Sequence, residues 1–197
     1  MLIAQDVSFS YPAGPKVLHQ VSLEVAPGER VALRAPSGFG KTTLCQIMAG
    51  YVQPSQGQVL VDGERLPRRG VCPVQMIWQH PERVLDPRMR MGRALAQAGP
   101  VDERVMDELG IRREWMDRFP HELSGGELQR FCIARALGAN PRYLIADEIS
   151  TMLDALTQAQ LWRFLRDEAE RRGLGMVVVS HSPALLEQVA TRVVDLV

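Results

Sequence analysis

The residues best suited to phosphate chemistry form one short run, Ala35-Pro36-Ser37-Gly38-Phe39-Gly40-Lys41-Thr42-Thr43. Gly38 and Gly40 let backbone N–H groups approach phosphate oxygens without a Cβ in the way. Lys41 can reach the β- and γ-phosphates of a nucleotide, and the Thr42 hydroxyl can bind Mg²⁺. A glycine turn before an ordinary helix is the competing interpretation. The Gly-Lys-Thr-Thr sequence favours a phosphate-binding loop.

Two further features of this loop bear on its function, the alanine at its start and its lysine. The usual pattern begins with glycine, but this chain has Ala35, which disfavours positive φ, so we expect a usable loop that is slightly constrained. Lys16 and Lys41 are the only lysines of the chain, and all other cationic side chains are arginines. Retention of lysine at position 41 suggests that the site requires a compact ammonium group.

The flanking segments have the pattern that such a loop needs. Residues 29–34 alternate in polarity like a buried strand, and residues 42–50 carry Leu44, Ile47 and Met48 at helical spacing. A strand, a glycine-bearing loop and a helix start therefore follow one another, and the helix N-terminus adds a partial positive charge at the loop.

Two carboxylates, Asp147 and Glu148, end a short apolar strand predicted over residues 142–147. Ligands of open α/β sheets bind at the carboxyl ends of the strands. Asp147 can hold Mg²⁺ through a water molecule, and Glu148 can orient or deprotonate an attacking water. Paired acids are often a solvated turn, but in a chain with a phosphate loop the functional interpretation is favoured.

A second candidate phosphate site begins a helix that we predict from Ser124 to about Gly138. Ser124 and Glu127 have the spacing of a capping box. Gly125 and Gly126 each weaken a first turn by about 1 kcal/mol relative to alanine, which is a poor choice for stability alone. The presence of both glycines is explained if an anion must approach the backbone N–H groups of this turn closely.

Three further polar or aromatic residues stand near predicted strand ends or turns. Tyr11 can stack on an adenine ring, although its position alone favours surface packing. Gln79 can present its amide to Mg²⁺ or to an attacking water. His181 follows the strand predicted over residues 175–179 and can donate a hydrogen bond to a γ-phosphate. The residues alone leave structural roles open for all three.

The rest of the chain indicates an α/β protein with a helical insertion. Further strands are predicted over residues 2–9, 17–25, 58–61, 71–78 and 192–197, and further helices over residues 156–171 and 183–189. Between them, the pattern predicts short helices over residues 91–98, 102–109 and 113–119. We expect this insertion to pack on its own small apolar set, formed by Leu95, Val105, Leu109, Trp115 and Met116.

Composition narrows the class of protein. The 197 residues carry a formal net charge of +0, which gives no electrostatic reason to expect nucleic acid as a partner. Cys45, Cys72 and Cys132 are scattered and indicate reduced cysteines, not a metal site or disulfides. The N-terminal residues lack the basic region of a signal peptide, and no apolar run approaches membrane-spanning length.

Taken in order, these motifs resemble the ATP-binding cassette (ABC) ATPases over nearly the entire chain. The matches are Tyr11 as the adenine-stacking position, residues 35–43 as the phosphate loop, Gln79 as the Q-loop, residues 123–129 as the signature, residues 144–148 as the second nucleotide motif, residues 151–154 as the D-loop and His181 as the switch histidine. The resemblance favours functional roles for Tyr11, Gln79 and His181. Besides Ala35, departures are Ile149 in place of proline and Thr151-Met152 in place of Ser-Ala.

The resemblance implies a P-loop NTPase fold with an N-terminal antiparallel β-subdomain and an inserted α-helical subdomain. Residues 1–197 would form a single domain, with the catalytic core at about 1–82 and 140–197 and the helical signature subdomain at about 83–139. It implies ATP and Mg²⁺ as cofactors. Thr42, Gln79 and Asp147 would serve the metal, and catalysis would use Lys41, Gln79, Glu148 and His181.

The resemblance also implies partners. Two ABC subunits, identical or different, would enclose two ATP molecules head to tail, so that Ser124, Gly125, Gly126 and Asp154 serve nucleotide binding at the interface. Gln79 followed by Leu85-Asp-Pro-Arg-Met89 resembles the dipeptide, oligopeptide and nickel importer branch. Permease subunits would dock at Arg83–Met91, with Val84, Leu85, Met89 and Met91 as apolar contacts; the alternative is that these side chains cover the core of the helical subdomain.

The implied function is ATP hydrolysis that drives import of peptides, nickel or related small solutes, at the cytoplasmic face of the inner or plasma membrane. The alternative is a soluble ABC-type ATPase that acts as a scaffold or switch in a cytosolic enzyme complex. A DNA-repair or ribosome-associated role is disfavoured, because the chain has neither long coiled-coil insertions nor a second cassette.

Overall fold

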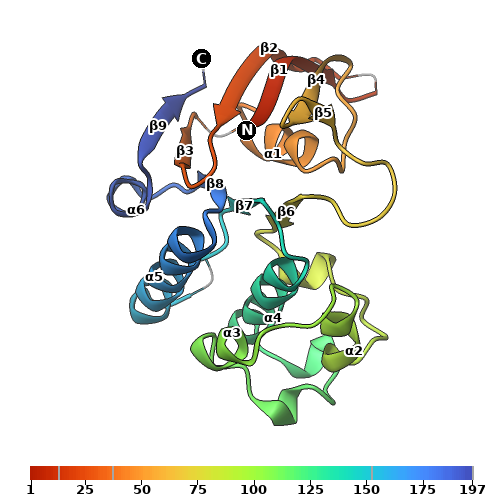
Figure 1. Ribbon diagram of the computed structural model, residues 1–197, viewed down its shortest axis with the longest axis vertical. Coiled ribbons are helices and arrows are strands. Elements are labelled where there is room, and N and C mark those ends of the chain that lie inside the picture. Colours follow the sequence, from red (N-terminus) through yellow and green to blue (C-terminus); the bar gives the residue numbers. More distant parts are fainter. Residues whose placement is uncertain (13, 37, 152, 197) are drawn as a thin grey trace.

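The computed structural model describes residues 1–12, 14–36, 38–151 and 153–196 and contains two β-sheets, longer helices beside one of them and a group of short helices. The antiparallel sheet has the strand order β2-β1-β4-β5. Its strands are β1 (Leu2–Ser10), β2 (Lys16–Val25), β4 (Gln56–Val61) and β5 (Glu64–Arg65). Figure 1 shows this sheet at one end of the molecule and the short helices at the opposite end.

The parallel sheet lies between them and has the order β6-β7-β8-β3-β9. Its strands are β3 (Arg30–Arg34), β6 (Val74–Ile77), β7 (Tyr143–Asp147), β8 (Gly175–Val179) and β9 (Arg192–Asp195). β7 and β8 are buried along their whole length, as parallel strands covered on both faces are. All five strands run in one direction, so the loops after β3, β6, β7 and β8 leave from one edge of the sheet.

Strand β6 is shorter than the strand predicted over residues 71–78. The carbonyl of Pro73 accepts backbone hydrogen bonds from Arg142 and Tyr143, at the point where the pairing with β7 begins. Proline has no N–H to offer a ladder, so regular pairing begins only at Val74.

Four longer helices accompany the parallel sheet. They are α1 (Lys41–Met48), α4 (Gly125–Gly138), α5 (Ala155–Arg172) and α6 (Pro183–Val189). Ser124 caps α4 and Asp154 caps α5, and each side chain accepts a hydrogen bond from a backbone N–H group of the first turn. Among the described residues, no helix is both long and apolar enough to cross a membrane.

The segment before α4 contains α2 (Met91–Ala96) and α3 (Glu103–Glu108), together with the 3₁₀ turns η1 (Pro81–Arg83), η2 (Arg113–Trp115) and η3 (Pro120–Glu122). The prediction of a helix over residues 113–119 is wrong. The carbonyls of Met116 and Arg118 accept hydrogen bonds from the N–H groups of Gly92 and Met91, at the start of α2. Within the segment itself, the N–H groups of Met116 and Arg118 donate to the carbonyls three residues back, those of Arg113 and Trp115, so the chain forms 3₁₀ turns here and not an α-helix.

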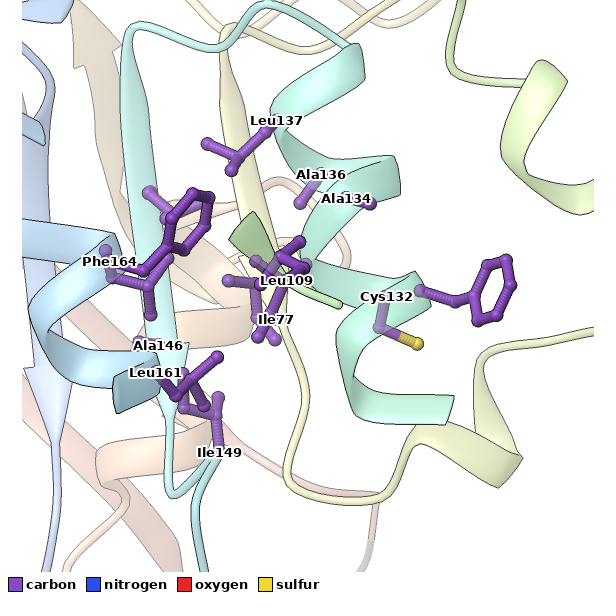
Figure 2. Close-up of a cluster of buried hydrophobic side chains, with 14 of the residues drawn as sticks. Ile77, Leu109, Cys132, Ala134, Ala136, Leu137, Ala146, Ile149, Leu161 and Phe164 are labelled. Atoms are coloured by element: carbon purple, nitrogen blue, oxygen red, sulfur yellow. The ribbon is translucent and has the colours of Figure 1, made fainter. Parts of the chain in front are cut away.

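The parallel sheet separates two apolar cores. Tyr143 and Ile145 of β7 face the core that contains α1 and the antiparallel sheet, whereas Leu144 and Ala146 face the core that contains α4 and α5. This division follows from the alternation of side chains along a strand. Figure 2 shows the second core, where Leu161 and Phe164 of α5 lie near Ala146 of β7.

The expectation of a separate small core in the helical insertion is wrong. Leu95, Val105, Leu109 and Trp115 are buried in the same cluster as the side chains of α4, α5 and β7, and Met116 packs against it. Burying these side chains against the body of the protein removes more apolar surface from water than short helices can cover among themselves. The subdomain boundaries themselves remain a prediction.

Charged groups also join the insertion to α5. Glu168 of α5 is 2% exposed and accepts hydrogen bonds from Arg104 of α3 and from Arg171 and Arg172. Burial raises the pKa of Glu168, but hydrogen bonds from Arg171 and Arg104 and the nearby arginine charges outweigh it and lower the pKa to about 2. The carboxylate is therefore a buried anion that is well paired.

Candidate active site

The phosphate loop joins β3 to α1, as predicted. Gly38 and Gly40 have φ values of 82° and 83°, which favour glycine. A Cβ at Gly40 would lie 2.8 Å from the side chains of Val17 and Leu18. Ala35 does not have a positive φ, so the constraint expected at that position is absent. Ser37 lies outside the described residues.

Lys41 begins α1, and its side chain folds back over the loop. Its Nζ donates hydrogen bonds to the carbonyl oxygens of Ala35 at 2.7 Å and Pro36 at 3.1 Å. The side chain is buried, although it carries a charge. The loop thus holds one ammonium group close to the helix N-terminus, where both favour an anion.

Asp147 is the second buried charged group of the site. It is 2% exposed, and its Oδ1 has no hydrogen-bond partner. Burial raises the pKa of Asp147, a hydrogen bond from Thr42 lowers it, and the charge of Glu148 raises it again. A buried carboxylate oxygen without a partner, next to a hydroxyl group, fits a divalent cation.

The described residues contain no cluster of three or more His, Cys, Asp or Glu side chains that could hold a metal ion by itself. A cation at Thr42 and Asp147 would therefore take its other ligands from Gln79, which lines the same cavity, and from a bound nucleotide and water. Mg²⁺ is bound in this way when one or two carboxylates act together with phosphate oxygens.

Three residues from three adjacent strands meet at Glu148. Gln79 follows β6 and donates its amide to Glu148 Oε2 at 3.0 Å. His181 follows β8, and its Nε2 lies 2.8 Å from Glu148 Oε1. Glu148 itself follows β7 and has a φ of 50°, an unusual conformation for a residue other than glycine. Its N–H donates to the Val179 carbonyl at 3.0 Å, which helps to hold this backbone conformation.

Tyr11 lies beside the phosphate loop. Its hydroxyl group is 3.2 Å from the Thr43 Oγ1, and its ring meets the Phe9 ring edge to face at 4.9 Å between centroids. A cavity of about 370 Å³ begins at this ring; it is lined by Tyr11, Val17, Gly38, Gly40, Lys41, Thr42, Thr43, Glu148 and His181. The structure therefore brings the tyrosine, the loop, the glutamate and the histidine to one cavity.

Among the residues that the structure describes, those of the signature and the D-loop do not line this cavity. Ser124 and Glu127 form the predicted capping box, in which the Glu127 carboxylate accepts the Ser124 N–H at 2.7 Å. A Cβ at Gly126 would lie 3.0 Å from Leu153, so this glycine also allows close packing of the segment before α5. Asp154 accepts hydrogen bonds from Leu156 and Thr157 as the cap of α5. Met152 lies outside the described residues.

The predicted docking segment is partly core. Leu85 is 4% exposed and Met91 is 0% exposed, and both belong to the core cluster that contains α4 and α5. Their assignment as free docking contacts is therefore wrong, because contact with this core already removes both side chains from water. Met89 packs against the same cluster, while Val84 remains partly exposed.

Sequence reasoning missed the cavity beside this segment. It has a volume of about 560 Å³ and is lined by Thr42, Gln46, Tyr51, Trp78, Gln79, His80, Arg83, Val84, Arg135 and Asp147. Tyr51 and Trp78 meet edge to face at 5.0 Å in its wall, and Tyr51 is 55% exposed. The sequence offered one indication of this cavity, because Tyr51 is a large aromatic residue directly after Gly50, where the helix was predicted to stop.

Comparison with known proteins identifies the family. The ABC transporter family matches residues 18–151. A putative peptide import ATP-binding protein of Brucella ovis is 36% identical over 92% of this chain, which spans 63% of that relative. The probable D,D-dipeptide transport ATP-binding protein DdpF of Escherichia coli K12 is 32% identical over 98% of this chain and 68% of its own length.

The fold agrees with this assignment. The solved structure of an ATP-binding subunit of an ABC transporter superimposes with a TM-score of 0.85 and 28% sequence identity. The alignment covers 99% of this chain and 85% of that one. The predicted fold class is thereby confirmed, with a P-loop core, an antiparallel sheet and helices inserted before α4. The chain belongs to the ABC transporter family.

Proposed function

We propose that this chain binds and hydrolyses ATP and that hydrolysis drives a membrane importer. The observation that carries the proposal is the set of contacts around Glu148. Gln79 and His181 hold both oxygens of its carboxylate, beside the cavity that contains Lys41 and Thr42. A carboxylate fixed next to a phosphate-binding loop is suited to accept a proton from a water molecule that attacks the γ-phosphate.

Each residue has a role in this proposal. The N–H groups of residues 38–43 and the Lys41 ammonium hold the β- and γ-phosphates, and the Tyr11 ring stacks on the adenine. Thr42, Asp147 and Gln79 would hold Mg²⁺, and the ion would neutralise charge on the phosphates. Glu148 takes the proton of the attacking water, while Gln79 and His181 keep its carboxylate in place.

For the signature and D-loop residues the proposal is a dimer, as the resemblance to ABC ATPases implies. Ser124, Gly125, Gly126 and Asp154 are absent from the lining of the phosphate-loop cavity of their own chain. In a head-to-tail pair, the start of α4 would instead face the nucleotide of a second ABC subunit, identical or different. In this arrangement residues 1–82 and 140–197 form the core, and residues 83–139 form the helical subdomain that presents the signature.

The relatives named above are a putative peptide import protein and a probable D,D-dipeptide transport protein, which favours peptides over nickel among the solutes that the resemblance implies. The permease would dock at the cavity between Tyr51 and Val84, at the cytoplasmic face of the membrane. Apolar and aromatic side chains with Arg83 beside them suit an interface core. This cavity also contains Gln79, so docking and nucleotide state can affect each other.

The first test replaces the proposed catalytic base. Glu148→Gln should keep ATP affinity but lower turnover by about 10²- to 10⁴-fold, because an amide cannot accept the proton of the water. Glu187→Gln, at an exposed position of α6, is the matched control and should hydrolyse ATP like the wild type. Turnover at the wild-type rate by Glu148→Gln would exclude Glu148 as the base.

A further inference from the structure

Gln129 is a buried polar residue in the first half of α4. Its side chain is 3% exposed, and its neighbours Leu128, Phe131 and Cys132 all belong to the core. A buried amide needs a hydrogen-bond partner, because desolvation without one is costly. Gln129 finds this partner outside its helix, since its Nε2 donates to the carbonyl oxygen of Trp78 at 3.2 Å.

The acceptor lies at a sensitive point of the chain. β6 ends at Ile77, where its pairing with Ala146 of β7 also ends. The Trp78 carbonyl belongs to the peptide unit that supplies the backbone nitrogen of Gln79. Gln129 therefore holds the backbone directly before Gln79, and the Gln79 amide donates to Glu148 at 3.0 Å.

The position of Gln129 on α4 gives this contact a consequence. Ser124 caps α4, and five residues at 1.5 Å each place Gln129 about 7.5 Å further along the helix. Arg130 of the same helix donates to the Leu109 carbonyl, so α4 is also tied to the helical insertion. One helix thus connects the signature residue, the insertion and the backbone that carries Gln79.

We propose that Gln129 is a positioning residue that fixes the placement of Gln79 against the Glu148 carboxylate. Through this contact, a displacement of α4 moves the Trp78–Gln79 peptide and changes how Glu148 is held. The proposal rests on the ATPase function proposed above. In this proposal Gln129 affects turnover without contacting the nucleotide.

The kinetic test replaces the donor without a large change in volume. Gln129→Met should lower kcat by about tenfold or more while the Kd for ATP stays close to the wild-type value, because misplacement of a positioning group affects the reaction. Gln129→Asn keeps an amide but is one methylene shorter, so it should also lower kcat. It serves as the second variant if Gln129→Met does not fold. Gln188→Met, at an exposed position of α6, controls for the substitution itself.

A double-mutant cycle decides whether Gln129 acts through Gln79. In a Gln79→Ala background, Gln129→Met should lower kcat no further, because the group that it positions is already gone. A merely structural role would give additive effects on kcat in the two backgrounds, and additivity would overturn the proposal. Thermal unfolding of all four chains separates a loss of stability from the loss of turnover.

A spectroscopic measurement tests the same contact without any ATPase activity. The side-chain amide signal of Gln79 in a ¹H–¹⁵N spectrum of the nucleotide-free protein can be assigned by its loss in Gln79→Ala. Gln129→Met should shift this signal, and Gln188→Met should leave it in place. An unshifted signal in Gln129→Met overturns the inference. Absence of ATP hydrolysis by the wild-type chain would instead overturn the proposed function, while the spectrum still decides the inference.

Discussion

The imidazole Nε2 of His181 lies 2.8 Å from Oε1 of Glu148, while Gln79 donates to the other oxygen of the same carboxylate. A carboxylate offers about four acceptor sites, so both oxygens can still accept a hydrogen bond from water. The contact joins the residues that follow two neighbouring strands, β7 and β8, which pair from Tyr143 to Asp147. It makes the histidine a direct neighbour of the proposed base.

Removal of this neighbour should affect the reaction more than binding. His181→Ala should lower kcat by about 10- to 100-fold, with the Kd for ATP nearly unchanged, because the Glu148 carboxylate loses one of its two fixed partners. Steady-state ATPase assays and equilibrium titration with ATP measure the two quantities. His19→Ala, at an exposed position of β2, is the control. A rise of about 10- to 100-fold in the Kd for ATP with no change in kcat would show that His181 contributes to nucleotide affinity instead.

The shared-site proposal predicts complementation between two inactive chains. Ser124→Arg should block the ATP site of the neighbouring chain, whereas Lys41→Ala should disable the ATP site of the chain that carries it. A mixed dimer should therefore contain one intact site. The mixture should exceed either parent in ATPase activity. Ser124 also caps α4, and its loss should cost about 1 kcal/mol of stability, which thermal unfolding would detect.

The control for this experiment is a chain that carries both substitutions. Mixed with Lys41→Ala, it cannot form an intact head-to-tail site and should stay inactive. If the first mixture also never exceeds its parents, a homodimeric head-to-tail site is ruled out.

The proposed docking surface is the cavity beside η1. Tyr51→Asp combined with Val84→Asp should leave folding and intrinsic ATPase activity intact, because both side chains are at least partly exposed. It should abolish co-purification with membrane subunits, since charges would enter an apolar interface core. Val193→Asp, on an exposed position of β9, is the control.

Leu85→Asp provides a contrast within the same segment. Leu85 is 4% exposed, so this variant should unfold or lose several kcal/mol of stability by burial of a carboxylate. If Leu85→Asp folds normally, the segment is not core. If the Tyr51 and Val84 double variant still binds membrane subunits, the docking surface lies elsewhere.

The buried Asp147 carboxylate should lower the stability of the nucleotide-free protein while it serves the binding of Mg²⁺. Its pKa is raised in the folded protein, so ionisation destabilises the fold, by about 1.4 kcal/mol for each pKa unit. Asp147→Asn should therefore stabilise the nucleotide-free protein at neutral pH. The gain should be absent below the unfolded pKa of about 3.9 and should grow as the pH rises through the folded pKa.

The same variant should lose the Mg²⁺ dependence of ATP affinity, because an amide lacks the charge of the carboxylate. Urea unfolding from about pH 4 to about pH 8 and ATP titration with and without Mg²⁺ measure the two effects. Lower stability of Asp147→Asn at neutral pH would mean that the buried carboxylate is favourable to the fold.

The sequence by itself determined the local parts of the site. The glycines of the phosphate loop, the Ser124–Glu127 capping box and the two acids at the end of β7 all depend on interactions within a few residues, and their patterns predicted each element correctly. Backbone conformations at glycine and side-chain caps are properties of short segments, so a single sequence carries them. The order of these motifs was also enough to predict the fold class.

Tertiary structure decided which of these parts meet. Gln79 and Glu148 are near each other because β6 pairs with β7, and Gln129 reaches Trp78 because α4 packs on the same sheet. The sequence predicted that Leu85 and Met91 contact a permease subunit, yet both are buried by residues distant in sequence. Strand register and burial depend on contacts between distant segments. Local patterns therefore predicted which side chains were available, but only packing determined their neighbours.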